Sequence, residues 1–304
     1  LMQQIAQLFL ILIMGYAVVK AGLLKASDSR VLSVVMVYLV TPCVIINAFQ
    51  IDDTPEIRKG LLYSMAIAAA IHVVLLVLSA LLSRPLKLDA VEQVNVIYSN
   101  AAALVIPLVK ALMGDAYVIY SCAFIIVQLV LLWTHASSLL QGSSALDWKK
   151  VLTNINMIAI AAGALLYWFR VVLPAPLQNT MSTVGNMMGP MGMLLAGMAI
   201  AEKPLREVFC TRRNYLPTVL RLVVCPLVVL VLLWVCHASS WVADGKNILM
   251  TVYLAAITPA CATVTSMAQL YDRDAAHSSA LYVLTTLLSI VSMPVMIGLF
   301  DLLL

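Results

Sequence analysis

Charged residues are scarce in this sequence: Asp, Glu, Lys and Arg make up 11% of its 304 residues, whereas 63% are hydrophobic. A soluble domain would carry about a quarter charged residues. The apolar residues form continuous runs of about 20 residues, which is long enough for a helix to cross the hydrocarbon core. We therefore predict an all-α polytopic membrane protein, because a β-barrel would show short alternating segments instead.

Acidic pairs and catalytic motifs are also missing from the apolar runs. The acids, such as Asp52, Glu56 and Asp272, lie in loops or at span ends. The sequence contains no HExxH, GxSxG or P-loop pattern. We therefore predict that the protein is not an enzyme and that it holds neither a cofactor nor a metal.

Neither the cysteines nor the basic residues form a recognition pattern. The six cysteines include no CxxC pair, and five lie in apolar runs, where cysteine behaves as a small buried hydrophobe. The net charge is only +4, and the basic residues are scattered between the apolar runs. We therefore predict no nucleic-acid partner.

Continuous hydropathy predicts ten membrane-spanning helices joined by short connections. The predicted spans are residues 2–19, 31–50, 60–82, 91–113, 116–140, 151–170, 177–200, 215–236, 246–268 and 276–299.

The distribution of Lys and Arg predicts the orientation of these spans. Twelve of the 18 basic residues lie in or beside the odd-numbered connections, and Arg221 lies inside span eight. The even-numbered connections and their flanks hold only five: Arg58, Lys59, Lys110, Arg170 and Lys246. Since cytoplasmic loops carry the excess of Lys and Arg, we expect the odd connections in the cytoplasm. Both termini would then lie on the outer side of the cytoplasmic (inner) membrane.

Prolines inside the spans suggest an internal repeat. They lie in spans two, four, seven and nine, as Pro42, Pro107, Pro190 and Pro259. Because seven and nine are two and four plus five, we predict two five-helix halves, residues 1–140 and 151–304, the second inverted relative to the first. Pro226 and Pro294 lack such counterparts, and the alternative is that these prolines only kink packed helices.

Two stretches interrupt their spans, residues 99–110 and 257–266. Pro107 removes a backbone donor and frees the carbonyl of Ala103, and Pro259 has the same effect in span nine. We expect spans four and nine to break at these prolines and to face each other, because freed backbone groups persist in a membrane only beside protein or a polar cavity. Each following half-helix would point its positive end into the break, which favours an anion.

The residues predicted to bind that anion surround the two breaks. They are Asn100, Ala101, Pro107, Lys110, Thr258, Pro259, Ala260, Thr263 and Thr265. Amide and hydroxyl groups offer donors, and Lys110 either pairs with a carboxylate or extends to the outer interface.

Other polar residues inside spans carry two interpretations each. Pro42, Asn47 and Gln128 are candidates to line the cavity, and Gln128 would alternatively bond a neighbouring helix. His72 is a candidate for proton coupling, or it is a neutral histidine in helix packing. In span seven, Gly185, Gly189 and Gly197 form a packing seam first and a hinge second.

Several of these segments resemble the auxin efflux carrier family of bacterial and plant transporters. The resemblance lies in 38–42, in Ser99–Leu108 with Gly114, in 258–272 and in 287–294. Val105 stands where the family usually has Gly, and Lys110 where an apolar residue is usual. The short connection after span five is similar to that of the short bacterial branch.

The resemblance implies ten spans with crossing broken helices, a scaffold part, a transport part and elevator-like alternating access. It also implies a homodimer and organic-anion substrates such as malonate or malate. Our main hypothesis is therefore a secondary active transporter of a small mono- or dicarboxylate, with proton or sodium coupling left open. The alternatives are a sodium-coupled organic-anion symporter, and a channel or non-transporting ligand sensor with this fold.

Overall fold

The computed structural model describes residues 2–50, 54–142, 153, 155–202 and 205–304, and these are almost entirely helical. Within these ranges the only extended pairing is one antiparallel bridge, between Ser99 and Ala260. The prediction of an all-α fold is confirmed.

The helices of the first half precede residue 142. They are α1 (Met2–Lys20), α2 (Ser29–Val35), α3 (Thr41–Ala48), α4 (Pro55–Ser83), α5 (Ala90–Ile97), α6 (Ala101–Met113), α7 (Val118–Leu131) and α8 (Ser137–Gln141). Short 3₁₀ turns, η1 (Ala26–Asp28) and η3 (Asp115–Tyr117), precede α2 and α7. The π-helical turns η2 (Met36–Val40) and η4 (Leu132–Ala136) join α2 to α3 and α7 to α8.

The helices of the second half follow residue 153. They are α10 (Ile155–Trp168), α11 (Ala175–Gly185), α12 (Met188–Glu202), α13 (Leu205–Cys210), α14 (Tyr215–Val219), α15 (Cys225–Val235), α16 (Gly245–Ile257), α17 (Ala262–Leu270) and α18 (Ala275–Leu303). The 3₁₀ turns η5 (Arg212–Asn214) and η7 (Ala238–Ser240) flank α14 and α15, which the π-turn η6 (Leu220–Val224) joins.

Five helical segments are long and apolar enough to cross a membrane. They are Ser29–Asn47, Pro55–Ser83, Val118–Gln141, Arg212–Val235 and Ala275–Leu303. They match predicted spans two, three, five, eight and ten, and shorter apolar helices lie in spans one, six and nine. The chain is therefore a multi-pass membrane protein, whereas the count of ten spans stays a prediction.

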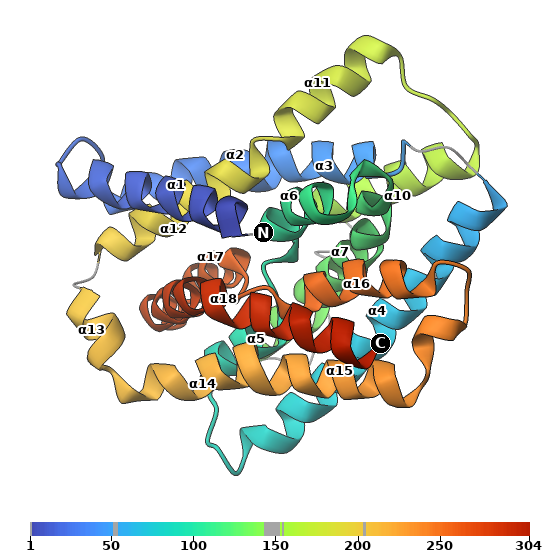
Figure 1. The fold of residues 1–304 in the computed structure, drawn as a ribbon. Coiled ribbons are helices and arrows are strands. Elements are labelled where there is room, and N and C mark those ends of the chain that lie inside the picture. Colours follow the sequence, from blue (N-terminus) through green and yellow to red (C-terminus); the bar gives the residue numbers. More distant parts are fainter. Residues whose placement is uncertain (1, 51–53, 143–152, 154, 203–204) are drawn as a thin grey trace.

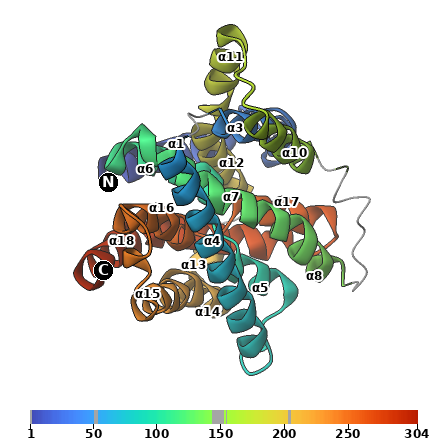
Figure 2. The ribbon, with the colours of Figure 1, turned by 90° about the vertical axis from the view of Figure 1, so that its right-hand side faces the viewer.

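The helices pack in two groups, which Figures 1 and 2 show on opposite sides of the molecule. In one group α1 runs along α12, and α3 packs against α10 and α11. In the other, α4 packs on α7, α16 packs on α4, α6 and α7, and α18 packs on α5 and α17. The groups meet where α12 contacts α6 and α18 and where α3 contacts α7.

Two glycines bring α1 and α12 into backbone contact. A Cβ on Gly197 would lie 1.9 Å from the carbonyl oxygen of Leu12, and a Cβ on Gly15 would lie 2.2 Å from that of Leu194. Small residues permit this approach between membrane helices. The packing role predicted for Gly197 is confirmed.

Adding one methyl group at this contact should weaken the packing of α1 against α12. We expect Gly197→Ala to lower the free energy of unfolding by about 1–3 kcal/mol, because the backbones must separate. The measurement is unfolding in mixed micelles titrated with SDS. Gly298→Ala is the matched control, because nothing lies within 4 Å of a Cβ there. An equal response of the two variants would contradict the proposed contact.

Predicted span seven is two helices instead of one. α11 ends at Gly185 and α12 begins at Met188. A Cβ on Gly185 would lie 3.0 Å from the Val44 side chain in α3, so this glycine also packs closely. Pro190 lies in the first turn of α12, where the missing N–H of proline has no helical partner to lose.

Two other prolines directly follow π-helical turns. Pro42 is the second residue after η2, and Pro226 is the second residue after η6. Such turns are common at functional sites, and the wider turn accommodates a residue that cannot donate a hydrogen bond. The turn η6 carries Arg221.

Candidate functional site at the crossing of two broken helices

Two helix pairs are each interrupted by a short extended segment, and the segments cross. Residues 98–100 separate α5 from α6, and residues 258–261 separate α16 from α17. The Asn100 N–H donates to the carbonyl of Pro259 (2.8 Å), and the Cys261 N–H donates to the carbonyl of Tyr98 (3.1 Å). The two interruptions predicted in spans four and nine therefore touch each other.

The interruption in span four does not lie where the proline predicts it. Pro107 is inside α6, which begins at Ala101, so the expected break at Pro107 is wrong. The chain leaves the helix earlier, because Gln128 and Pro259 offer partners to the backbone of residues 99 and 100. In span nine the prediction is correct, since Thr258 is extended (ψ 156°) directly before Pro259.

Side chains from two neighbouring helices satisfy the extended backbone. Gln128 in α7 accepts from the Ser99 N–H (3.0 Å) and hydroxyl (2.7 Å), and its amide donates to the Ser99 carbonyl (2.7 Å). Thr285 in α18 accepts from the Ala260 N–H (3.1 Å). Of the two interpretations of Gln128, bonding a neighbouring segment is the one that the structure shows. Unpaired buried backbone groups are costly, so these hydrogen bonds stabilise the extended backbone at the crossing.

A single arginine binds the carboxyl-terminal ends of both first half-helices. Arg221 is 1% exposed. Its Nη1 donates to the carbonyls of Val96 and Ile97 (both 3.1 Å) at the end of α5. Its Nε (3.0 Å) and Nη2 (2.8 Å) donate to the carbonyl of Thr258, and Nη2 also donates to that of Ala256, at the end of α16. All its partners among the described residues are backbone carbonyls.

The charge of this group matches the two helix ends that it binds. A helix carries about half an elementary negative charge at its carboxyl terminus and half a positive charge at its amino terminus. Arg221 therefore offsets the negative ends of α5 and α16 together. The amino-terminal ends of α6 and α17 leave the same crossing, at Ala101 and Ala262, and the first N–H groups of a helix have no carbonyl partner within the helix.

Two buried donors without partners lie beside these positive ends. The Asn100 amide nitrogen and the Tyr282 hydroxyl have no hydrogen-bond partner, although the residues are only 3% and 2% exposed. The Asn100 and Thr286 side chains both lie within interaction distance of the Tyr282 hydroxyl. Buried polar groups normally find a partner, so both groups are placed to donate to an acceptor that binds here.

This part of the crossing faces the other helix group. Tyr282 and Leu104 pack with Leu12 of α1 and Met193 of α12, and Ala262 lies against the same cluster. A molecule bound here would lie at the boundary between the two groups.

The remaining predicted site residues divide by role. The carbonyls of Thr258 and Pro259 and the N–H of Ala260 hold the crossing itself. Ala101 and Thr263 lie in the first turns of α6 and α17, where Ala101 is buried and Thr263 is partly exposed.

Thr265, Pro107 and Lys110 stand apart from this arrangement. Thr265 lies one turn further along α17, and its hydroxyl is 3.0 Å from that of Ser278 in α18. The side chains of Pro107 and Lys110 lie outside the described residues, so their predicted contacts stay predictions.

A cavity of about 990 Å³ opens between the two helix groups, between α3, α10 and α11 on one side and α6 and α7 on the other. Its lining includes one charged residue and several amides: Arg170, Asn47, Gln50, Gln178 and Asn186. Asn47 lines this cavity, whereas Pro42 and Gln128 do not, and a place for these residues at the anion site stays a prediction. The cavity reaches Ile106, about 7–8 Å along α6 from Ala101.

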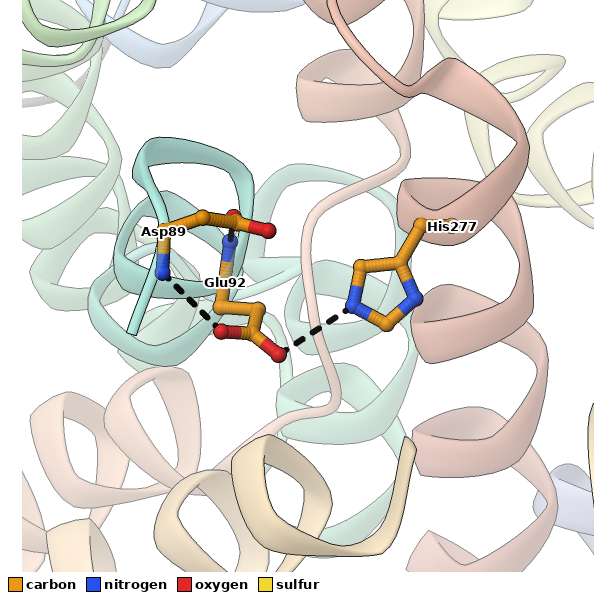
Figure 3. Close-up of side chains that lie close together, drawn as sticks. All are labelled: Asp89, Glu92 and His277. Carbon is orange, nitrogen blue, oxygen red and sulfur yellow. Dashed lines mark hydrogen bonds and ion pairs between the residues drawn. The ribbon is translucent and has the colours of Figure 1, made fainter. Parts of the chain in front are cut away.

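Asp89, Glu92 and His277 form a second polar cluster, where α5 and α18 begin (Figure 3). Glu92 is buried and accepts from the Asp89 N–H (3.0 Å), from His277 Nε2 (3.3 Å) and from two nitrogens of Arg213. The residue types suit a metal, but the guanidinium already occupies both carboxylate oxygens and opposes a cation. We interpret the cluster as a clasp that joins the starts of three spans.

An analogous clasp lies where α16 and α7 begin. The Tyr117 hydroxyl donates to Asp244 (2.5 Å), and the Asn247 amide donates to the same carboxylate (2.6 Å). In both clasps an Asp precedes the first half-helix and a polar residue follows three positions later.

His72 shows the packing interaction that was one of its two interpretations. Its Nδ1 donates to the carbonyl of Ala68 (2.7 Å), and its ring lies 4.6 Å from that of Phe124. The other ring nitrogen is buried without a partner. Proton coupling through His72 stays a prediction.

Sequence reasoning did not identify Arg221 and Tyr282 as site residues. A charged residue within an apolar run is by itself a signal of function, and that signal was available for Arg221. Tyr282 carried no signal beyond being a hydroxyl within span ten.

A family model described as "Membrane transport protein" matches residues 1–149 and 144–297. The two matches together cover nearly the whole chain. A search of curated proteins found no match.

Proposed function

Because the chain belongs to the membrane transport protein family, the family of the auxin efflux carriers, we propose that it is a secondary active transporter of a small organic anion. Mono- and dicarboxylates such as malonate or malate are the proposed substrates. The proposed location is the cytoplasmic membrane, with both termini outside and with a homodimer as the assembly.

One observation supports an anionic substrate above the others. At the crossing, the negative helix ends are already matched by Arg221, whereas no acidic side chain among the described residues is recorded at the positive ends of α6 and α17. The unpartnered donors of Asn100 and Tyr282 lie on this positive side. A carboxylate would accept from both donors and bring a negative charge to the positive helix ends.

The cavity between the helix groups supports access from one side. Gln50, Ala116 and Arg170 line it, and they lie at connections two, four and six, which the distribution of basic residues predicts to be outside. The structure would then represent an outward-open state. Movement of the α4–α8 and α14–α18 group against the other group would carry the site across, as in an elevator mechanism.

The two clasps support an inverted repeat. The first links the start of span four to the start of span ten, and the second links the start of span nine to the start of span five. In a repeat of five spans, span four of one half corresponds to span nine of the other, and span five corresponds to span ten. The two clasps therefore join equivalent pairs of spans. Two halves of opposite orientation would place these clasps on opposite membrane faces.

Flux into reconstituted vesicles tests the function. We expect saturable uptake of labelled malonate or malate, which unlabelled carboxylates inhibit and glycerol does not. Uptake of only a neutral solute or a cation would contradict the proposal. Non-saturating flux would indicate a channel instead, and carboxylate-induced thermal stabilisation without flux would indicate a ligand sensor.

A further inference from the structure

The carbonyls that bind Arg221 form the kind of oxygen cage that usually holds a cation. Four carbonyl oxygens, from Val96, Ile97, Ala256 and Thr258, converge on one buried group from two different half-helices. Backbone carbonyl oxygens are typical ligands of hard cations, including those in membrane channels. In this chain a side chain fills the cage.

The guanidinium fits the cage in charge and in donor count. Its five N–H groups correspond to five hydrogen bonds with these carbonyls. The titratable groups that face it are His72, Cys225 and Cys261, and none of them is a carboxylate. The positive charge therefore has no partner among the described residues except the two helix ends.

We propose that Arg221 is a resident cation that replaces a bound coupling ion at the crossing. It supplies permanently the charge that sodium would otherwise supply at the ends of α5 and α16. The anion site on the opposite side of the crossing is then formed without sodium. This last step rests on the proposed function, whereas the cation cage itself does not.

Chemical rescue tests the cage without any measurement of transport. Arg221→Ala removes the guanidinium and leaves the four carbonyls in place. We expect its unfolding midpoint in detergent to fall, and to rise again by about 3–6 °C in a saturable way when free guanidinium chloride reaches a tenfold excess over its Kd. Low millimolar concentrations keep the probe well below denaturing levels.

Neutral and bulky probes separate this effect from general stabilisation. Urea, which has the same shape without the charge, and choline chloride should not raise the midpoint of Arg221→Ala. The control variant is Arg206→Ala, at an exposed position on α13, whose midpoint guanidinium should leave unchanged. Rescue by urea or choline, or no rescue by guanidinium, would overturn the cage.

The unmodified protein provides the second arm, which does not depend on how well the variant folds. In sodium-free choline buffer, malonate should raise its unfolding midpoint by the same amount as in sodium chloride. A saturable requirement for sodium would overturn the resident-cation proposal while leaving anion transport intact. Absence of flux together with successful guanidinium rescue would overturn the proposed function alone.

Discussion

Replacing Arg213 with alanine is expected to lower the free energy of unfolding by about 3–5 kcal/mol, because it leaves a buried carboxylate without its main partner. The Glu92 side chain is 1% exposed, and Arg213 Nε donates to it at 2.5 Å. The Asp89 N–H and His277 remain nearby but supply only one hydrogen bond each. Removal of the arginine should therefore destabilise the start of α5.

The opposite replacement should cost less, because the two partners differ in exposure. The Arg213 side chain is 41% exposed, so water can solvate it after Glu92→Gln. Glutamine also preserves the shape of the buried group. We therefore expect Glu92→Gln to lower the free energy of unfolding by about 1–2 kcal/mol. The double variant should be more stable than Arg213→Ala alone, since no buried charge remains unpaired.

Unfolding in mixed micelles titrated with SDS measures all three variants. Arg212→Ala is the matched control, because Arg212 is the exposed neighbour on the same 3₁₀ turn. A coupling energy below about 0.5 kcal/mol between positions 92 and 213 would mean that the clasp is not an interacting pair.

The sequence allowed the class of fold and the two interrupted spans to be predicted, but not the exact position of the first interruption. A proline identifies a residue that cannot donate, and Pro259 marks its break correctly. Pro107 does not, because the start of α6 is decided by Gln128, 29 residues from Ser99, and by the backbone of Pro259. Such partners are a property of the tertiary structure and leave no local signature.

The role of Arg221 also depends on partners that are distant in the sequence. Its position within an apolar run was visible, and it could be counted as a basic residue of span eight. Its partners are Ala256 in α16 and Thr258 directly after it, 35 and 37 residues away, and two residues of α5 that lie 124 and 125 residues away. Only the fold shows that one side chain joins the ends of two half-helices, and hence that the crossing has one matched and one unmatched side.

The unmatched side leads to the last prediction, in which stability and transport respond in opposite directions. Asn100→Asp keeps the shape of the side chain and its place directly before α6, but it adds a negative charge beside two positive helix ends. That charge should bind those ends as the substrate anion would, as acids do at helix amino termini. We therefore expect the unfolding midpoint to stay the same or rise.

Anion transport by the same variant should fall steeply. Two like charges 4 Å apart repel by about 4 kcal/mol at an effective dielectric of 20, which corresponds to about 10³-fold in kcat/KM. Tyr282→Phe, which removes only a hydroxyl donor, should reduce kcat/KM by about 10- to 100-fold, because a hydrogen bond to a charged group contributes about 1.5–3 kcal/mol.

Labelled malonate uptake into vesicles, alongside thermal unfolding of the same preparations, measures both responses. Tyr253→Phe is the control for loss of a buried phenol, since its hydroxyl contacts the Pro226 carbonyl (3.4 Å) away from the positive ends. If Asn100→Asp transported malonate as well as the unmodified protein does, the anion could not lie at the ends of α6 and α17. If it lost both stability and transport, the positive ends would not be the unmatched charge that the substrate completes.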